Sequence, residues 1–245
     1  MALRVGFDLD GVLADMDGAL AREAKKLFGS RLKERAERQS KGALAPESNP
    51  VHDPTSDNAP LLQELRLTAS ERRHLWHHVT EIDGFWESLD EIEPGIVARL
   101  AAVTAEKGWE IIFLTKRPAT AGATAQVQSQ RWLEARGFRL PSVYVVTASR
   151  GLIAVALTLD IVVDDTPENC VDVAADSKAR TIAVFRNETP PPVAFQGMGI
   201  QVVRSTDEGI TLLVDIDSSV SRVEKPPGTI QRLMETLGLK QPSDT

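Results

Sequence analysis

The sequence predicts an α/β protein with a Rossmann-like parallel sheet and an inserted, mainly helical domain. Six short apolar segments have the length and the Val and Ile content of strands, and helical patterns separate most of them. The segments show little apolar–polar alternation, which is typical of strands that are covered on both faces, as in a parallel sheet. The alternation of strands with helices favours a doubly wound arrangement. A chain of 245 residues, 42% of them apolar, is long enough for one such core and a smaller appended domain.

Short-range signals locate the elements of this core. Strands are expected at residues 3–9, 109–114, 143–146, 159–163, 181–185 and 200–203. Helices are expected at residues 96–107, 121–136 and 167–177. The first helix has apolar residues at helical spacing and Gly108 as a stop signal. The third begins with Thr166 as a candidate N-cap and Pro167 at the first helical position.

The interval between the first two strands is too long for a plain crossover and predicts an inserted domain. Residues 18–39 have a charged helical pattern, and residues 60–80 also look helical. Between them, residues 41–60 are rich in Pro, Ser, Asn and Asp and are expected to form a flexible loop. The predicted domains are a core at 1–17 and 84–220, an insertion at 18–83, and a C-terminal tail or helix at 221–245.

Composition excludes several classes of protein. Lys and Arg number 28 and Asp and Glu 35, so the formal charge of −7 does not favour a duplex nucleic-acid partner. The one cysteine, Cys170, cannot form an internal disulfide or a thiolate metal cluster. The longest apolar stretch, 151–163, is shorter than the ~20 residues of a membrane helix and contains Asp160. No signal-peptide pattern opens the sequence, so a cytoplasmic protein without a membrane partner is expected.

The strongest functional signal is DLDGVLAD at residues 8–15. Asp8 and Asp10 follow an apolar strand, and residues two apart on an extended chain point the same way. Gly11 then allows a sharp turn of the backbone. Two like charges this close repel each other, so the arrangement needs a cation or a shared proton. The alternative is an ordinary acidic surface turn.

A second apolar strand ends in IVVDDTPEN at residues 161–169, again with paired carboxylates before a helix. Ligand sites of open α/β sheets lie beyond the carboxyl ends of the strands. Asp8, Asp10, Asp164 and Asp165 are therefore expected to converge on one hard cation. Oxygen ligands of this kind suit Mg²⁺, whose coordination is commonly completed by water and substrate phosphate.

A third strand ends in LTKRP at residues 114–118. The hydroxyl of Thr115 and the backbone amides that follow it are suited to a phosphate oxygen. The three strand ends together predict a site for a phosphorylated ligand and a divalent cation.

In this order, DLDGV, LTKRP and VVDD resemble motifs I, II and IV of the haloacid dehalogenase (HAD) superfamily, over residues 1–17 and 84–186. The resemblance implies a Rossmann-like core with a C1 cap in the insertion. It also implies Mg²⁺-dependent phosphoryl transfer through an aspartyl-phosphate, which agrees with the ability of carboxylates to act as nucleophiles.

Residue roles carry over from this resemblance by position. Asp8 is the implied nucleophile, and Asp10 the general acid/base whose carbonyl also faces the metal. Thr115 is implied to bind the transferring phosphoryl group, Asp164 to ligate the metal, and Asp165 to support it. An aspartate at the position of Asp10 implies a phosphatase rather than a dehalogenase.

One element departs from the HAD pattern. The expected position of the motif III lysine is in residues 147–151, and the basic residue there is Arg150. Arg150 is expected to contact phosphate or Asp8, although arginine and lysine are not interchangeable. Lys116 is a second candidate for the ammonium group, with a solvated loop charge as the alternative.

The exit of the insertion, DGFWESL at 83–89, is similar to the corresponding segment of the 5′(3′)-deoxyribonucleotidases, as is DGVLAD. This resemblance implies that Phe85 and Trp86 stack on a nucleobase, a contact worth ~1–3 kcal/mol, and that Asp15 lines the pocket. The alternatives are that the two rings only seal the cap against the core and that Asp15 holds its turn.

The predicted function is a Mg²⁺-dependent HAD-type phosphatase that hydrolyses a small phosphorylated metabolite, with a nucleoside monophosphate as the first candidate substrate. One alternative is a phosphatase for a sugar phosphate or another small metabolite. The other is a catalytically weak HAD-fold protein that binds a ligand or a partner, because Arg150 replaces the motif III lysine.

Overall fold

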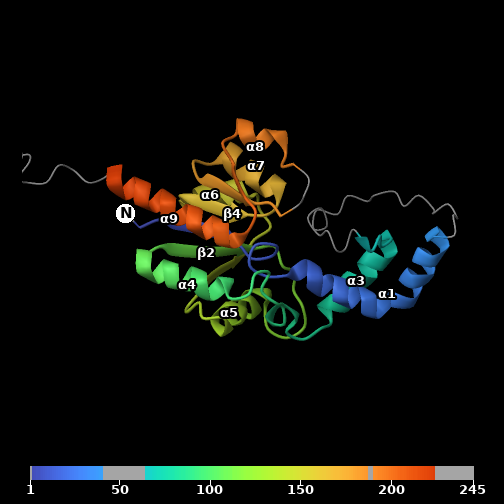
Figure 1. Ribbon diagram of the computed structural model, residues 1–245. Coiled ribbons are helices and arrows are strands. Elements are labelled where there is room, and N and C mark those ends of the chain that lie inside the picture. The colour runs from blue at the N-terminus through green and yellow to red at the C-terminus, as the bar shows by residue number, and fades with distance from the viewer. Residues whose placement is uncertain (1, 41–63, 187–189, 224–245) are drawn as a thin grey trace, which may run out of the picture. The chain divides into compact units, whose positions relative to one another are not determined.

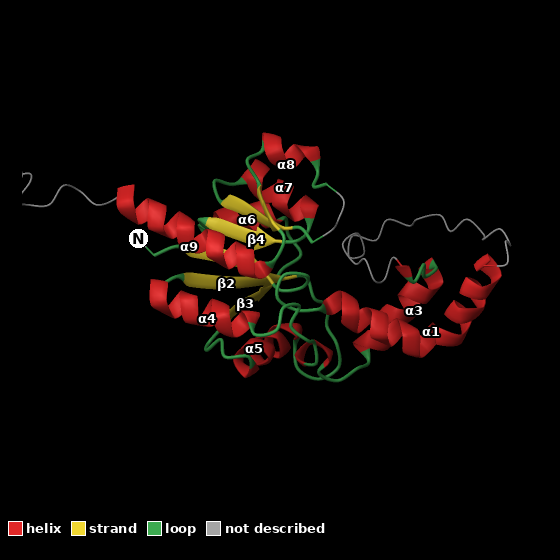
Figure 2. Ribbon diagram, viewed as in Figure 1, coloured by secondary structure: helices red, strands yellow, loops and turns green. Residues whose placement is uncertain are grey.

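The core of the protein is a six-stranded parallel sheet in the order β3-β2-β1-β4-β5-β6 (Figures 1 and 2). The computed structural model describes residues 2–40, 64–186 and 190–223. The strands are β1 (Arg4–Asp8), β2 (Glu110–Thr115), β3 (Ser142–Val145), β4 (Ile161–Asp164), β5 (Arg180–Val184) and β6 (Gln201–Val203). All six predicted strands are present within two residues of their predicted bounds, and the predicted parallel sheet is confirmed.

Helices connect these strands. They are α1 (Met16–Ser40), α3 (Ala69–Thr80), the 3₁₀ helix η1 (Phe85–Glu87), α4 (Ile96–Lys107), α5 (Ala125–Ala135), α6 (Arg150–Ala156), α7 (Pro167–Asp176), α8 (Val193–Gly197) and α9 (Thr206–Val223). The predicted helix 96–107 coincides with α4, and Gly108 follows it with a φ of 68°. The sequence analysis did not anticipate α6, α8 and α9. The first two are only seven and five residues long, too short for a clear helical period.

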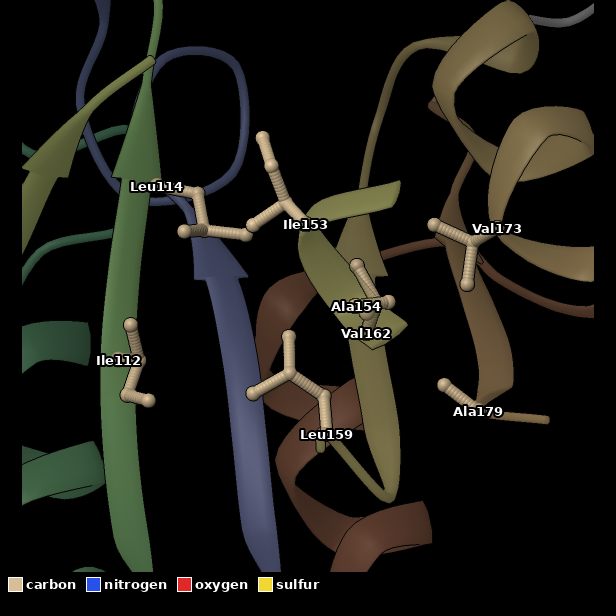
Figure 3. Packing of buried hydrophobic residues seen from close by; sticks show 8 residues of the cluster. All are labelled: Ile112, Leu114, Ile153, Ala154, Leu159, Val162, Val173 and Ala179. Carbon is tan, nitrogen blue, oxygen red and sulfur yellow. The ribbon is translucent and has the colours of Figure 1, made fainter. Parts of the chain in front are cut away.

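One apolar face of the sheet is covered by α6 and α7. Side chains of these helices pack against side chains of β2 and β4, and Figure 3 shows this layer at close range. The cluster consists of Ile112, Leu114, Ile153, Ala154, Leu159, Val162, Val173 and Ala179. Gly6 on β1 lies beneath this cluster, where an added Cβ would be 2.8 Å from a methyl carbon of Leu159. A larger residue at position 6 would therefore push the leucine out of the layer.

The opposite face of the sheet is covered by α4 and α5. Right-handed crossovers that move outward in opposite directions from the centre place α5 and α7 on opposite faces, as Figure 2 shows. Phe113 on β2 points to the α5 side and meets Phe138 edge-on, with ring centroids 4.8 Å apart. The sheet is thus buried from both sides, which explains its lack of apolar–polar alternation.

Between β1 and β2 the chain forms an antiparallel helical hairpin of α1 and α3. Phe28 meets His74 edge-on with ring centroids 5.6 Å apart, and His78 Nε2 lies 3.1 Å from Glu23. Thr68 begins α3 with a capping box, in which its hydroxyl accepts from the Glu71 amide. The helical character predicted for the insertion is therefore present, while its bounds at 18–83 stay a prediction.

Two other expectations, the loop at 41–60 and the tail or helix at 221–245, lie outside the described residues apart from the end of α9. The described residues up to Gly209 belong to one compact unit, and those from Ile210 to Val223 belong to a second. Within the described segments, no helix combines the length and the apolar character needed to cross a membrane.

Candidate active site at the carboxyl ends of the strands

Three neighbouring strands bring the predicted motifs together. β1 lies between β2 and β4, so Asp8, Thr115 and Asp164 stand at adjacent carboxyl ends. All three residues are buried although they are polar. A buried polar side chain is costly unless it is paired, so the partners of these groups describe the site.

The turn after β1 requires a glycine. Gly11 has a φ of 78°, in the left-handed region. A Cβ at this position would also lie 2.0 Å from an oxygen of Asp165. The loop after β1 therefore lies in contact with the carboxylate of Asp165, which follows β4.

Arg186 holds the same loop from a distant part of the sequence. Its guanidinium donates to the carbonyl oxygens of Gly11 and Val12, and to Thr206 Oγ1 at 2.8 Å. Glu93 balances this charge at 2.6 Å. The sequence analysis did not single out Arg186, because its partners lie far away in the chain.

Arg150 lies between two of the site carboxylates. Its side chain is 2% exposed, its Nη2 donates to Asp8 Oδ1, and its Nε lies 3.3 Å from Asp164 Oδ2. Its Nη1 is buried without a hydrogen-bond partner among the described residues. Lys116, the second candidate, is exposed, and its Nζ lies 3.1 Å from Asn169 Oδ1. Arg150 is thus the basic residue that contacts Asp8.

Asp164 is held by hydrogen bonds on both oxygens. Its Oδ1 accepts from the Thr166 amide at 2.9 Å and from Asn169 Nδ2 at 3.1 Å. Its Oδ2 accepts from Asn169 at 3.0 Å and from Arg150. Three donor groups therefore hold the carboxylate, and Asn169 Nδ2 is shared between its two oxygens. Asn169 was missed from the sequence, although its place in the first turn of α7 directs it back toward the end of β4.

Asp10 has an arginine partner of its own, which the sequence analysis also missed. Arg117 Nε lies 3.0 Å from both Asp10 oxygens, and its Nη2 lies 2.7 Å from Oδ1. Thr115, predicted to bind phosphate, donates its hydroxyl to Asp10 Oδ2 at 3.1 Å. The predicted motifs I and II are therefore in direct contact.

Phe85 and Trp86 are buried, at 3% and 0% exposure. Their rings meet edge-on at 4.9 Å, and Trp86 Nε1 donates to the Pro118 carbonyl at 3.0 Å. The face of Trp86 lies 5.0 Å from the guanidinium carbon of Arg117. These contacts favour the packing alternative over base stacking, because neither ring offers a free face in this conformation.

Asp15 holds the start of α1. Its Oδ1 accepts from the Gly18 amide at 2.9 Å, and Arg22 lies 3.9 Å from its other oxygen. Asp15 lies so close to position 18 that a Cβ added there would be 2.1 Å from its carboxylate, which favours glycine. Asp15 thus makes the contacts of a turn-holding residue, the second alternative given above.

Three acidic side chains, Asp8, Asp164 and Asp165, lie close together, and Arg150 is paired with two of them. Burial, followed by the nearby Asp164, raises the pKa of Asp8 well above its ordinary value, even though Arg150 opposes the shift. Burial and Asp164 also raise the pKa of Asp165. A divalent cation among these groups would offset the repulsion.

The donor set fits a hard cation of the Mg²⁺ type. Such an ion takes one or two carboxylates and completes its coordination with water and phosphate oxygens. Over the described ranges, no group of three or more His, Cys, Asp or Glu side chains is arranged as a metal site.

The fold is shared with solved HAD structures. A HAD family hydrolase from Deinococcus radiodurans R1, with bound phosphate and sodium, superposes with a TM-score of 0.54 at 17% identity, over 87% of this chain and 96% of that chain. A putative β-phosphoglucomutase from Thermotoga maritima gives 0.51 at 17% identity, over 87% and 99%. The HAD-hydrolase YfnB from Bacillus subtilis, bound to magnesium, gives 0.52 at 12% identity, over 86% and 98%.

This protein has the HAD fold. At these identities the likeness concerns the fold alone, and it confirms the architecture implied by the sequence motifs. No family model and no curated protein sequence matches the chain. The HAD fold brings the motif residues to one edge of the sheet, where they contact one another.

Proposed function

We propose that this protein is a Mg²⁺-dependent phosphatase that hydrolyses a small phosphomonoester. The observation that carries the proposal is the pair of carboxylates at the end of β1, each held by a different buried arginine. Asp8 is paired with Arg150 and Asp10 with Arg117. Two carboxylates in different environments are suited to two different roles, one as nucleophile and one as acid and base. The HAD fold supports the reaction class.

Asp8 acts as the nucleophile. Its Oδ forms a bond to the phosphorus as the ester P–O bond breaks, and Asp10, which must be protonated for this step, gives that proton to the departing oxygen. Asp10 then takes a proton from a water molecule whose oxygen attacks the phosphorus. The bond between Asp8 and phosphorus breaks, which releases inorganic phosphate and restores the Asp8 carboxylate.

Arg150 orients Asp8 and holds positive charge beside the phosphoryl group. A guanidinium can bind a carboxylate and a phosphate oxygen at once through its five donors. Thr115 donates its hydroxyl to Asp10 in this structure and is proposed to donate it to a phosphoryl oxygen when the substrate binds. Lys116 is the second basic residue proposed for the phosphate, and in this structure its ammonium group contacts Asn169.

The residues proposed to hold Mg²⁺ are Asp8, Asp10 through its carbonyl, Asp164 and Asp165. Because Asp164 already accepts from Thr166, Asn169 and Arg150, Asp8 and Asp165 are the side chains assigned to direct coordination. When bound, the ion supplies neutralisation of the charge on the transferring phosphoryl group. The magnesium bound to the YfnB structure supports this choice of ion.

The substrate is proposed only as a small phosphorylated metabolite. A preference for nucleoside monophosphates stays a prediction from sequence resemblance, because both aromatic rings proposed to stack on the base are buried. A sugar phosphate or another small phosphate ester remains an equal alternative. A screen of nucleoside monophosphates and sugar phosphates at equal Mg²⁺ concentration decides between them.

The decisive experiment is hydrolysis of p-nitrophenyl phosphate with added Mg²⁺. The wild-type protein is expected to turn over, and the Asp8→Asn variant to be inactive. Asp160→Asn is the matched control, because Asp160 accepts from the Arg4 amide at the start of β1 and not at the site. Absence of turnover in the wild type with every phosphate ester would contradict the enzyme and favour a ligand- or partner-binding protein.

A further inference from the structure

We infer that Arg117 is a positioning residue that fixes the carboxylate of Asp10 for proton transfer. The inference rests on the proposed phosphatase function and deepens it. It assigns to the second arginine of the site a task that differs from that of Arg150.

The contact between Arg117 and Asp10 is a buried, bidentate pair. Arg117 Nε and Nη2 face the carboxylate at 2.7–3.0 Å, while the Arg117 side chain is 0% exposed and that of Asp10 is 12% exposed. A planar guanidinium that binds two oxygens at once sets the plane of the carboxylate as well as its distance. Asp10 therefore has one defined orientation while its edge remains open to solvent.

Three other elements hold the Arg117 fork itself. Its Nη1 donates to Ser129 Oγ on α5 at 2.9 Å, and Ser129 is fully buried. The ring of Trp86 in η1 covers the guanidinium at 5.0 Å. The Arg117 amide donates to Thr115 Oγ1 at 3.2 Å, and that hydroxyl in turn donates to Asp10. The orientation of Asp10 is thus set by Thr115 directly, and by Ser129 and Trp86 through the Arg117 guanidinium.

The two arginines divide the carboxylates between them. Arg150 pairs with Asp8 and Asp164, whereas Arg117 pairs with Asp10. Loss of Arg150 therefore disturbs the nucleophile and its surroundings. Loss of Arg117 disturbs the group that delivers a proton to the leaving oxygen, so its effect depends on how much the leaving group needs that proton.

This dependence gives a direct test. p-Nitrophenyl phosphate and phenyl phosphate have similar shapes, but phenolate is the poorer leaving group and needs protonation more. kcat/KM covers the steps up to formation of the phosphoenzyme, which include protonation of the leaving oxygen. Since general acid catalysis contributes about 10²–10⁴-fold, Arg117→Ala is expected to lower kcat/KM about 100-fold for phenyl phosphate and under about 10-fold for p-nitrophenyl phosphate.

Three further variants separate positioning from stability. Arg117→Lys keeps the charge but loses the fork, and it is expected to show the same selective loss. Ser129→Ala keeps both charges and removes one contact of the fork, so a smaller loss with the same selectivity is expected even if Arg117→Ala does not fold. Arg136→Lys is the control, because Arg136 lies over Trp132 at 4.3 Å and donates to backbone carbonyls.

The outcomes are distinct. Equal losses on both esters in Arg117→Ala and Ser129→Ala, or full rescue by Arg117→Lys, would overturn the positioning role while leaving the phosphatase intact. A wild-type protein that hydrolyses neither ester would instead refute the proposed function itself. A selective loss that is absent from Arg136→Lys supports the assignment.

Discussion

The pKa of a buried carboxylate is raised at the strand ends and lowered in the α1–α3 hairpin. Glu71 in the hairpin is 8% exposed and Asp8 in the site 6% exposed, and each has an arginine partner. Burial raises the pKa of Glu71, but hydrogen bonds from Thr68 and Arg35 outweigh it, and the pKa falls below the ordinary value of 4.5. Burial and neighbouring carboxylates raise the pKa of Asp8.

The difference lies in the balance of donors and acceptors. Glu71 accepts from the Thr68 amide and hydroxyl and from Arg35 at 2.5 Å. Glu23 in the same hairpin is similar, since hydrogen bonds with Lys26 and His78 outweigh its burial and lower its pKa. A carboxylate that stabilises the fold has enough hydrogen-bond donors around it, whereas several carboxylates buried together indicate a ligand site.

The largest expected effect comes from removal of the proposed nucleophile. Asp8→Asn is expected to lower kcat for p-nitrophenyl phosphate by at least about 10³-fold, because no other carboxylate can replace Asp8 in line with the phosphorus. Its melting temperature is expected to stay at or above that of the wild type, because one of the repelling charges is gone. A variant that keeps more than a tenth of the activity would remove Asp8 from the mechanism.

Removal of the cation beside Asp8 is expected to affect folding most. Arg150→Met leaves the Asp8 and Asp164 carboxylates buried without their partner, and the free energy of unfolding is expected to fall by about 3–5 kcal/mol. Urea denaturation measures this change. The control is Arg131→Met, which removes a surface pair with Glu87 and should cost less than ~1 kcal/mol. A similar fall in the free energy of unfolding in the two variants would show that burial of the ion pair does not determine its contribution.

Magnesium is expected to stabilise the strand-end site and not the hairpin. If the added Mg²⁺ concentration is about 10–100 times the Kd of the folded state, the free energy of unfolding rises by about 1–3 kcal/mol. Thermal denaturation with MgCl₂, against NaCl of equal ionic strength, measures the effect. Asp165→Asn should abolish it and Glu71→Gln should leave it unchanged. Stabilisation that survives Asp165→Asn would place the ion elsewhere.

The smallest effect is expected in the hairpin. Glu71→Gln weakens the capping box of α3 and is expected to cost about 1 kcal/mol at pH 7. Because the pKa of Glu71 is lowered on folding, its contribution is present above pH 4.5 and is lost as the pH falls through the lowered value. Urea titrations at pH 7 and pH 3 should therefore show a difference between variant and wild type that shrinks in acid. A difference that grows in acid would contradict the direction of the shift.

Much of the fold could be predicted because its signals are local. Strand composition, the stop at Gly108 and the start at Pro167 depend on neighbouring residues, and the corresponding elements are present. The short helix α6 was missed even though Ser149 caps it by accepting from the Gly151 amide. Seven residues contain too few turns for an apolar period to emerge.

Motif spacing was sufficient to place Asp8, Asp10, Thr115 and Asp164 at one edge of the sheet, because parallel strands share the direction of their carboxyl ends. Which arginine pairs with which carboxylate was decided only by the folded chain. Arg117 lies 107 residues from Asp10, and Arg150 lies 142 residues from Asp8. Burial of Trp86 against Arg117 likewise depends on contacts between separate elements. Local patterns specify where strands end, but the partner of a buried charge depends on the packing that removes it from water.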